Sequence, residues 1–298
     1  MRASYGTLQL LGLKPGGFPF SPRTAFFLIG EECSGNCAFC AQSAGQSDKL
    51  SRITWPEIDP NEAIEKLAFI QLDRICIQAV KSHPAFREAC EFLPKIKKAN
   101  SAPISASMHI ENLAQTELLF DLGCDSVSVA LDCSTEELSR VYKGRDLSSS
   151  FNLLQELATK WPGKVATHLI MGLGETEEEL VKLARKIIKA GASISLFAFT
   201  PIEGTLLENN TPPEPKRYRM VQVALALIRK NQDINLHYQN GKLVFEVLPR
   251  QLLEPEDFQN PGCSGCNRPY YNERPGGFMY NYPNPPDLDE ALSVLEEQ

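Results

Sequence analysis

Short apolar runs recur along the chain and predict a series of buried strands. The first is Phe26-Phe-Leu-Ile29, which leads directly into a cysteine-rich segment. A run of four to eight apolar residues between turn signals is typical of a strand that is covered on both faces. We therefore expect six strands, near residues 26–29, 74–80, 104–109, 125–131, 164–171 and 194–199.

Amphipathic stretches lie between these runs and predict helices. One begins at Asp59, and others are expected near residues 85–99, 112–122, 134–142, 150–160 and 176–190. The last follows a capping box formed by Thr176 and Glu179, and its apolar stripe consists of Leu180, Leu183, Ala184, Ile187 and Ile188. Strands that alternate with helices indicate repeated βαβ units and a parallel sheet.

The alternation of strands and helices ends after a helix that is expected near residues 216–230. Residues 234–247 read as a hairpin, because Asn240-Gly241 suits a two-residue turn between paired strands. The fold class is therefore α/β, as an open or partial barrel of about six parallel strands with a C-terminal hairpin and a loop-rich extension. We expect one domain over 1–298, with an irregular arm at 1–24, a barrel core at 25–206, and an extension at 207–298 that ends in a helix at 287–297.

Composition and charge narrow the function classes. The 298 residues carry a formal net charge of −7 and are 43% hydrophobic, so a globular protein is expected and a nucleic-acid binder, which needs clustered Lys and Arg, is not. The sequence shows neither a secretory leader pattern nor an apolar window long enough for a membrane helix, so we expect a cytoplasmic protein. Nine cysteines in such a chain point to metal or redox chemistry and not to disulfides.

Three of these cysteines lie in one short segment, Cys33-Ser-Gly-Asn-Cys37-Ala-Phe-Cys40. Gly35 and its polar neighbours favour a loop that curls around a bound group. Three thiolates from one loop suit an iron–sulfur cluster, whereas a structural zinc normally takes four protein ligands. The alternative is a set of unrelated buried cysteines, although such residues usually occur singly.

The C-x3-C-x2-C spacing, with an aromatic residue before the last cysteine, resembles the signature of the radical S-adenosylmethionine (SAM) superfamily. The resemblance implies that Cys33, Cys37 and Cys40 hold a [4Fe–4S] cluster whose open iron binds the amino and carboxylate groups of SAM. Phe39 would lie near the adenine. The implied chemistry is one-electron cleavage of SAM to methionine and a 5′-deoxyadenosyl radical, which abstracts hydrogen from an unactivated carbon.

Other candidate site residues stand at the carboxyl ends of the predicted strands, where α/β barrels gather their reactive groups. These are Gln78, His109, Asp132, the segment 172–175 and the segment 201–205. The stretch His168-Leu-Ile-Met-Gly172-Leu-Gly-Glu175 resembles the superfamily's fifth-strand motif, with His168 in place of its first glycine. The resemblance implies cofactor contacts from Ile170 and Gly172 to the adenine and from Asp132 to the ribose or a polar substrate group. Glu175 ends this motif and is also expected at the cofactor. The superfamily's second-strand Gly-Gly-Glu motif, which meets the SAM amine, is absent, and Gln78 stands near its place as the expected cofactor contact.

Some of these residues also have ordinary structural interpretations. Gly172-Leu-Gly174 can be a strand-to-helix turn alone. Asp132 can be a loop residue. His109 and His168 are expected to line the site or the core and not to bind metal, because no spacing pairs them with other ligands.

A second cysteine pair lies in Pro261-Gly-Cys263-Ser-Gly-Cys266. It can begin a zinc site, form a redox dithiol, or supply two ligands to a second cluster. Cys76 is our candidate third ligand, because Cys76 and Gln78 share one face of their predicted strand; a plain core residue is the alternative. Cys90 and Cys124 are expected in the core, and Cys133 is a reserve ligand. Ser264, Tyr270 and groups from solvent are candidate ligands for the fourth iron of this second cluster.

The barrel is similar to the biotin-synthase branch, and the tail Cys263-Ser-Gly-Cys-Asn-Arg-Pro-Tyr-Tyr-Asn-Glu-Arg-Pro resembles components of the two-protein lipoyl synthase. This implies sulfur insertion at C6 or C8 of an octanoyl chain on a lipoyl carrier protein, with a sacrificial auxiliary [4Fe–4S] cluster at Cys76, Cys263 and Cys266. Expected partners are the carrier, a second synthase component, and an electron donor such as ferredoxin or flavodoxin. Residues expected to receive the carrier are Arg268, Tyr270, Tyr271 and Arg274.

Two other functions remain open. One is biotin synthase or another radical SAM carbon-skeleton enzyme. The other is a zinc- or cluster-bearing scaffold or electron-transfer protein, which counting of iron and sulfide would separate from an enzyme.

Overall fold

The six predicted apolar runs form the parallel part of one sheet in the computed structural model, which describes residues 1–16, 22–232, 236–260, 262–268, 272–273 and 276–296. The strand order is β1-β2-β5-β6-β7-β8-β9, and only β1 is antiparallel to its neighbour. β1 and β9 are the two edges, so the barrel is partial and open. The bounds are β1 Arg2–Ala3, β2 Thr24–Ile29, β5 Arg74–Ala79, β6 Ile104–Ser107, β7 Ser126–Ser128, β8 Val165–Met171 and β9 Ser193–Ala198.

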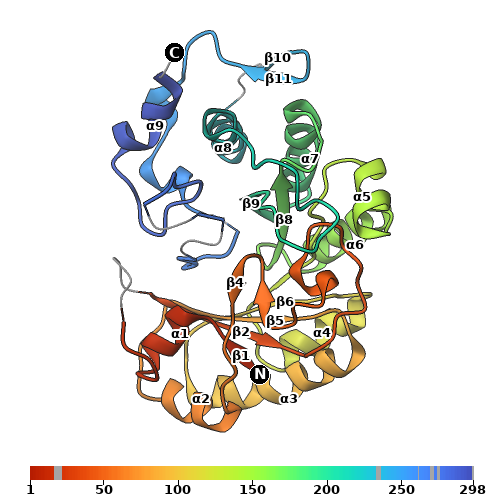
Figure 1. Ribbon diagram of the computed structural model, residues 1–298, viewed down its shortest axis with the longest axis vertical. Coiled ribbons are helices and arrows are strands. Elements are labelled where there is room, and N and C mark those ends of the chain that lie inside the picture. Colours follow the sequence, from red (N-terminus) through yellow and green to blue (C-terminus); the bar gives the residue numbers. More distant parts are fainter. Residues whose placement is uncertain (17–21, 233–235, 261, 269–271, 274–275, 297–298) are drawn as a thin grey trace.

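Helices cover the outer side of this sheet (Figure 1). Side-chain caps begin several of them, including Asp59, Ser82, Asn112 and Thr135, and the predicted capping box of Thr176 and Glu179 is present. The βα alternation brings the carboxyl ends of all six parallel strands to one end of the barrel. The bounds are α2 Pro60–Leu67, α3 His83–Ala99, α4 Leu113–Asp121, α5 Glu136–Lys143, α6 Leu147–Lys160, α7 Glu177–Lys189, α8 Pro215–Arg229 and α9 Leu288–Glu296.

The N-terminal segment is more regular than expected. The prediction of an irregular arm over 1–24 is wrong for its first ten residues, which form β1 and the helix α1 (Tyr5–Leu10). Ser4 caps α1 by accepting the Thr7 N–H at 3.2 Å, and β1 pairs with Leu28 and Phe27 of β2. A two-residue strand is too short to show a periodic pattern, so its pairing is visible only in the fold.

Short elements complete the chain. The expected hairpin is confirmed as β10 (His237–Gln239) and β11 (Lys242–Val244), and Asn240 and Gly241 both have the positive φ of its tight turn. A hairpin of β3 (Lys49–Leu50) and β4 (Ile53–Thr54) was not predicted. The single-turn helices are η1 Ala41–Ala44, η2 Arg250–Leu252 and η3 Pro255–Phe258.

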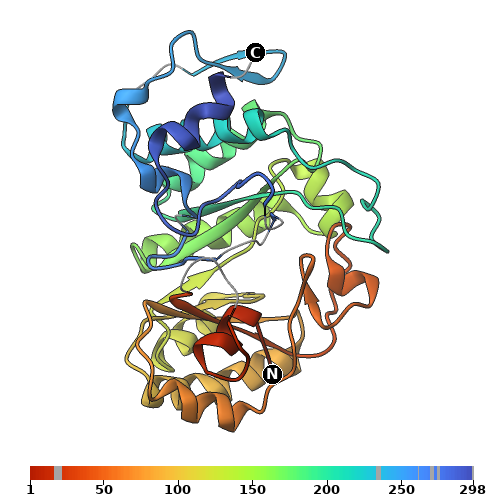
Figure 2. The same ribbon diagram turned by 60° about the vertical axis from the view of Figure 1, so that its left-hand side comes forward.

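The C-terminal segment runs back along the second half of the sheet (Figure 2). Arg219 of α8 is fully buried and fixes it, donating to the Met279 carbonyl at 2.8 Å and the Tyr280 carbonyl at 3.3 Å. The same guanidinium lies over the rings of Phe258 and Tyr282.

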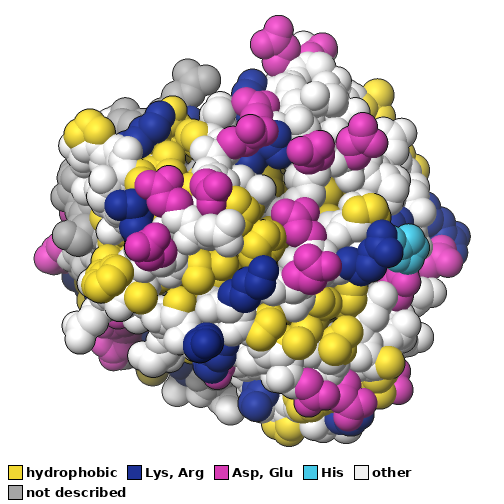
Figure 3. Space-filling view, turned by 90° about the horizontal axis from the view of Figure 1, so that it is seen from below, with side chains coloured by type: hydrophobic (Ala, Val, Ile, Leu, Met, Phe, Trp, Pro, Cys, Tyr) yellow, Lys and Arg dark blue, Asp and Glu magenta, His cyan; other side chains and the backbone are white. Residues whose placement is uncertain are grey.

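Acidic and basic side chains are interspersed over the face seen in Figure 3. Within the described residues, no helix combines the length and the apolar character that crossing a membrane would need.

Candidate functional site

The loop that follows β2 presents three cysteines at the carboxyl end of the sheet. It begins at Gly30, whose φ is +91° and where a Cβ would lie 2.5 Å from Val80 Cγ2, so only glycine fits. The Ser43 hydroxyl donates to the carbonyls of Cys37 at 2.6 Å and Cys40 at 2.7 Å. These bonds fold the loop back on itself and hold the two cysteines in place.

Two thiols of this loop, those of Cys33 and Cys37, lie near Gly35. The Gly35 N–H donates to Cys33 Sγ at 3.4 Å, and a Cβ on Gly35 would lie 3.4 Å from Cys33 Sγ and 3.9 Å from Cys37 Sγ. Burial raises the pKa of Cys37, and that of Cys40 to about 11. Thiols of this kind become thiolates at neutral pH only when a metal takes the place of the proton.

All three cysteines line one cavity of about 540 Å³. Phe39, Gln78, Asp132 and Ile170, four of the predicted cofactor-binding residues, line the same cavity. Gln78 is 7% exposed and its Nε2 has no hydrogen-bond partner, so a buried amide is left for a polar ligand. The cavity therefore suits a molecule with apolar and polar parts, held next to the cysteine loop.

Gly172 and Glu175 are placed differently from the other predicted cofactor residues. Glu175 accepts the N–H groups of Gly172 at 2.6 Å and Leu173 at 3.0 Å, and Gly172 has a φ of +105° against Phe199. Both residues thus build the turn between β8 and α7. Neither residue is among those that line the cavity of about 540 Å³, and their expected cofactor contacts stay a prediction.

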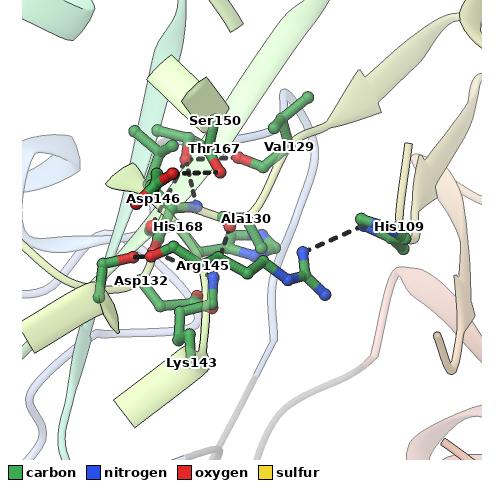
Figure 4. Close-up of polar contacts among 12 residues, drawn as sticks. His109, Val129, Ala130, Asp132, Lys143, Arg145, Asp146, Ser150, Thr167 and His168 are labelled. Atoms are coloured by element: carbon green, nitrogen blue, oxygen red, sulfur yellow. Dashed lines mark hydrogen bonds and ion pairs between the residues drawn. The ribbon is translucent and has the colours of Figure 1, made fainter. Parts of the chain in front are cut away.

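Asp132 is fixed on the cavity wall by a buried ion pair (Figure 4). Lys143 Nζ lies 2.7 Å from Asp132 Oδ2, and it also donates to the carbonyls of Ala130 and Leu131. Asp132 has a φ of 61°, and its backbone pairs with the strand β8. Lys143, at the end of α5, was not predicted as a site residue, because an isolated lysine on a charged helix carries no signal.

The two histidines both line the cavity. His168 meets the ring of Phe197 edge-on at 5.5 Å, and burial lowers the pKa of His168 to about 4. His109 receives a hydrogen bond from Arg145 (Figure 4). Both imidazoles are therefore neutral wall residues, as expected for site-lining histidines.

The second cysteine set converges at a neighbouring cavity. Cys76 of β5 is 8% exposed, and it lines this cavity together with Cys263 and Cys266 of the C-terminal segment. Cys76 and Gln78 do share one face of β5, with Cys76 directed to the second cavity and Gln78 to the first. The structure thus brings the three predicted auxiliary ligands together from segments almost 190 residues apart.

Two glycines allow the second pair to lie this close to the barrel. A Cβ on Gly262 would lie 1.6 Å from Ser195 Oγ, and one on Gly265 would lie 3.1 Å from the Asp73 carbonyl oxygen. The Gly262 carbonyl accepts from Ser193 at 2.7 Å, and the Gly265 carbonyl accepts from Thr24 at 2.8 Å. The segment is therefore bonded to the amino ends of β2 and β9, which are the first and the last of the parallel strands.

The donor set of this second cavity suits a metal cluster. Burial raises the pKa of Cys76, and that of Cys263 to about 12, while Arg268 and Arg74 act in the opposite direction on both. Asn260 Oδ1, buried on the same wall, has no hydrogen-bond partner. The free space is about 20 Å³, near that of one water molecule, so the cavity would have to widen for a cluster to bind.

The two cavities share part of their walls. Ser107, His168, Phe197 and Arg268 line both of them. Arg268 Nη2 lies 3.9 Å from Cys76 Sγ, and its guanidinium covers the Phe26 ring. Among the described residues, no three His, Cys, Asp or Glu side chains are arranged to chelate a single metal ion.

The remaining predicted residues divide into three groups. Cys124 is buried and Cys90 is half-buried, both packed in the main core as expected. Cys133 is fully buried beside Ala38 and Leu173, so the structure assigns this reserve ligand to a small apolar cluster instead. Tyr270, Tyr271 and Arg274 lie outside the described residues, whereas Arg268 lies on the cavity wall.

A sequence profile described as "Radical SAM superfamily" matches residues 27–187, more than half of the chain, and the match includes the whole cysteine loop. The chain belongs to the radical SAM superfamily. Membership implies a [4Fe–4S] cluster and SAM, and the three loop cysteines together with the orphaned Gln78 amide at one cavity fit these groups.

Two curated relatives are similar to this chain over most of its length. The chain is 27% identical over 203 residues to a biotin synthase of Neorickettsia sennetsu, a match that covers 66% of this chain and 62% of that protein. It is 26% identical to a biotin synthase of Rhodopseudomonas palustris, over 76% of this chain and 65% of that one. This radical SAM chain therefore spans less than two thirds of the length of these curated relatives.

The fold is also similar to that of a solved structure. The X-ray structure of the FeFe-hydrogenase maturase HydG from Carboxydothermus hydrogenoformans aligns with a TM-score of 0.57 at 15% identity, over 92% of this chain and 65% of that chain. At this identity the likeness concerns the fold alone.

Proposed function

We propose that this radical SAM protein inserts sulfur at an unactivated carbon, C6 or C8, of an octanoyl chain attached to a lipoyl carrier protein. The observation that supports the proposal is the meeting of Cys76, Cys263 and Cys266 beside the cavity of the cysteine loop. An enzyme that only generates a radical has no need of a second thiol set, whereas sulfur insertion needs a sulfur source next to the radical.

Each proposed cofactor has its own residues. Cys33, Cys37 and Cys40 would hold the SAM-binding cluster, and the second set would hold an auxiliary cluster that serves as the sulfur donor. When bound, these groups supply a 5′-deoxyadenosyl radical at the first cavity and sulfide at the second. Asp132, held by Lys143, offers two fixed carboxylate oxygens for ribose hydroxyls.

The protein's own part is to hold an acyl chain and to exclude water. Phe39, Ile170, Phe197 and Ile202 give the first cavity apolar walls, which suit an alkyl chain and keep solvent from a reactive radical. The walls shared by the two cavities place the bottom of the first next to the thiols of the second. An acyl chain that reaches from the first cavity to these shared walls would present its carbons to both proposed clusters.

Three partners follow from the proposal. They are the octanoylated carrier, a second synthase that performs the other insertion, and a one-electron donor such as ferredoxin or flavodoxin. Arg268 would receive the carrier-bound chain from within the cavity, and Tyr270, Tyr271 and Arg274 are proposed to assist it.

Biotin synthase activity is the second candidate, because the curated relatives carry that name. The two substrates differ in chemistry: one is a neutral acyl amide on a protein, and the other is a small free acid. Mass spectrometry of anaerobic reactions containing SAM, a reductant and either an octanoyl-lysyl peptide or the biotin precursor would separate them. Gain of sulfur by the peptide supports the first candidate, and gain by the precursor supports the second.

Cysteine variants test the sulfur source in the same reactions. We expect Cys76→Ser, Cys263→Ser and Cys266→Ser to cleave SAM while failing to thiolate the peptide. Cys90→Ser is the matched control, since this half-buried core cysteine lies outside both cavities. If the three variants thiolate the peptide like the control, the second set is not the source. If the unmodified protein cleaves SAM but thiolates neither substrate, another radical SAM carbon-skeleton reaction is favoured. If it does not cleave SAM either, a scaffold or electron carrier is favoured.

A further inference from the structure

Within the described part of the chain, three side-chain atoms of residues that line the first cavity are buried without a hydrogen-bond partner. They are Gln42 Oε1, Gln78 Nε2 and Asn272 Oδ1. A buried polar atom without a partner is costly, so such atoms beside a cavity indicate a group that binds there. Whether the atom donates or accepts decides which kind of group it suits.

Asn272 differs from the two glutamines in its place along the chain. Gln42 and Gln78 lie inside residues 27–187, the part that matches the superfamily profile, whereas Asn272 lies outside it in the C-terminal segment. The chemistry that the superfamily shares is the cleavage of SAM, so the matched part is expected to serve the cofactor first. A cavity residue outside that part is expected to contact the substrate.

The backbone of Asn272 is fixed to the sheet through a buried carboxylate. Glu273 is 4% exposed, and it accepts the N–H groups of Asn272 at 3.1 Å and Asn281 at 2.9 Å. The Asn281 side chain donates to the carbonyl of Leu196 in β9 at 3.0 Å. These bonds hold Asn272 in place before a ligand binds.

The side chain of Asn272 is oriented by Thr200, which lines the same cavity. Asn272 Nδ2 donates to Thr200 Oγ1 at 3.1 Å, and that hydroxyl donates to the Ala198 carbonyl at 3.5 Å. A hydroxyl has one hydrogen, so Thr200 accepts from the amide and does not donate to it. Nδ2 therefore faces Thr200, and Oδ1 is left as an acceptor without a donor.

An unpaired amide oxygen beside apolar walls suits an N–H group attached to an alkyl chain. Phe197 and Ile202, on either side of Thr200 in the sequence, give the cavity apolar lining. A secondary acyl amide has an N–H next to its alkyl chain, whereas an ester or a thioester has only acceptor atoms at that position. With either of these, Asn272 Oδ1 would stay buried and unpaired, which costs more than the loss of one bond.

We propose that Asn272 binds the N–H of an amide-linked acyl chain through Oδ1, and that Thr200 is the positioning residue that orients its side chain. Asn272 thereby selects an acyl group attached through nitrogen against the same group attached through oxygen or sulfur. This inference rests on the proposed function for its acyl substrate. Its test measures binding and not sulfur insertion, so failure of one does not imply failure of the other.

Equilibrium dialysis of the cluster-loaded protein with SAM and without reductant tests this selection, because no turnover occurs. The probes are N-(2-hydroxyethyl)octanamide and 2-hydroxyethyl octanoate, which differ only in that an ester oxygen replaces the amide N–H. The unmodified protein should bind the amide about 5- to 30-fold more tightly than the ester. Equal affinities, or no measurable binding of either probe, would overturn the proposal without any variant.

Substitution of Asn272 tests the assigned atom. Asn272→Leu keeps a similar size and removes the acceptor, so the preference for the amide should fall to about twofold or less. The matched control is Asn152→Leu, the same change at an exposed residue of α6, which should keep the full preference. A preference that persists in Asn272→Leu would refute the assignment. The affinity for SAM should stay within about twofold, and a loss as large as that for the amide would assign Asn272 to the cofactor instead.

Variants of Thr200 test the positioning role through the same ratio of affinities. Thr200→Ser keeps the hydroxyl and should retain most of the preference, whereas Thr200→Val keeps the shape without the acceptor and should reduce the preference to about threefold or less. A merely structural role would weaken both probes alike and leave the ratio unchanged. Equal ratios in the two variants would therefore overturn the positioning role. If Asn272→Leu does not fold, this pair and the unmodified protein still decide the proposal.

Discussion

Replacement of Gly262 by alanine tests how the second cysteine pair is attached to the barrel. The added Cβ would lie 1.6 Å from Ser195 Oγ, 2.8 Å from Ser195 Cβ and 3.1 Å from Ser195 N. The hydroxyl can rotate away, but the Cβ and the nitrogen belong to the buried strand β9 and cannot. Residue 262 must therefore move outward and carry Cys263 with it.

The free-energy cost of Gly262→Ala in the attached state has two contributions. Overpacking at a buried contact costs about 1–3 kcal/mol, and loss of the 2.7 Å bond from Ser193 to the Gly262 carbonyl adds about 1 kcal/mol. Detachment of the segment avoids most of this cost, because the barrel itself does not change. We therefore expect a small change in the melting temperature and a large loss of the proposed second cluster.

Iron and sulfide analysis after anaerobic reconstitution measures this effect. Gly262→Ala should retain about half of the iron and sulfide of the unmodified protein and should still cleave SAM. Adding Ser195→Gly removes the hydroxyl and the Cβ, so the double variant should recover part of the second cluster. Gly163→Ala is the control, since Gly163 has a φ of +74° but open space around it. Full iron content in Gly262→Ala would refute the reasoning.

Three further predictions concern buried polar groups. Lys143→Met leaves the Asp132 carboxylate unpaired at 15% exposure and should lower the free energy of unfolding by about 3–5 kcal/mol in urea titrations, whereas unchanged stability would mean that the pair contributes nothing. The pKa of His168 lies near 4 in the fold and near 6.5 when unfolded, so the unfolded chain binds the proton first and stability falls as pH drops. His168→Gln should reduce this loss between pH 7 and pH 5 by about 2 kcal/mol, and an identical pH dependence in both proteins would contradict the shift. Arg219→Met removes the hydrogen bonds to the Met279 and Tyr280 carbonyls, so limited proteolysis should cut the C-terminal segment sooner; unchanged cleavage would show that other contacts hold the segment.

The sequence predicts the sheet well because its strands are buried on both faces. Continuous apolar runs such as 26–29 can form little else, and the capping box at Thr176 marks its helix unambiguously. β1 and the β3–β4 hairpin have two-residue strands, whose pairing depends on neighbours far away in the chain. Elements this short have no pattern of their own.

The candidate site also has one part that the sequence predicts and one part that only the fold shows. The spacing of Cys33, Cys37 and Cys40 is local, so the sequence alone indicates a shared loop. The approach of Cys263 to Cys76 depends on Gly262 fitting against Ser195, a contact between distant segments that no local pattern reveals. The strand period could place Cys76 on an inward face, but only the fold shows that the C-terminal segment reaches it.

The contacts of His109 with Arg145 and Glu111 were also invisible in the sequence. His109 was expected on the cavity wall, but its partner comes from the loop after α5, on the next βα unit. Pairs of this kind depend on the relative rotation of neighbouring strands and loops. They can be identified only from coordinates.

Cluster counting on a variant with Cys33, Cys37 and Cys40 all replaced by alanine tests the central claim most directly. After anaerobic reconstitution and a check by circular dichroism that the protein is folded, iron and sulfide analysis with Mössbauer spectroscopy would count what remains. The account predicts about half of the iron and sulfide of the unmodified protein, held as one cluster by Cys76, Cys263 and Cys266. A folded variant without any cluster would contradict it.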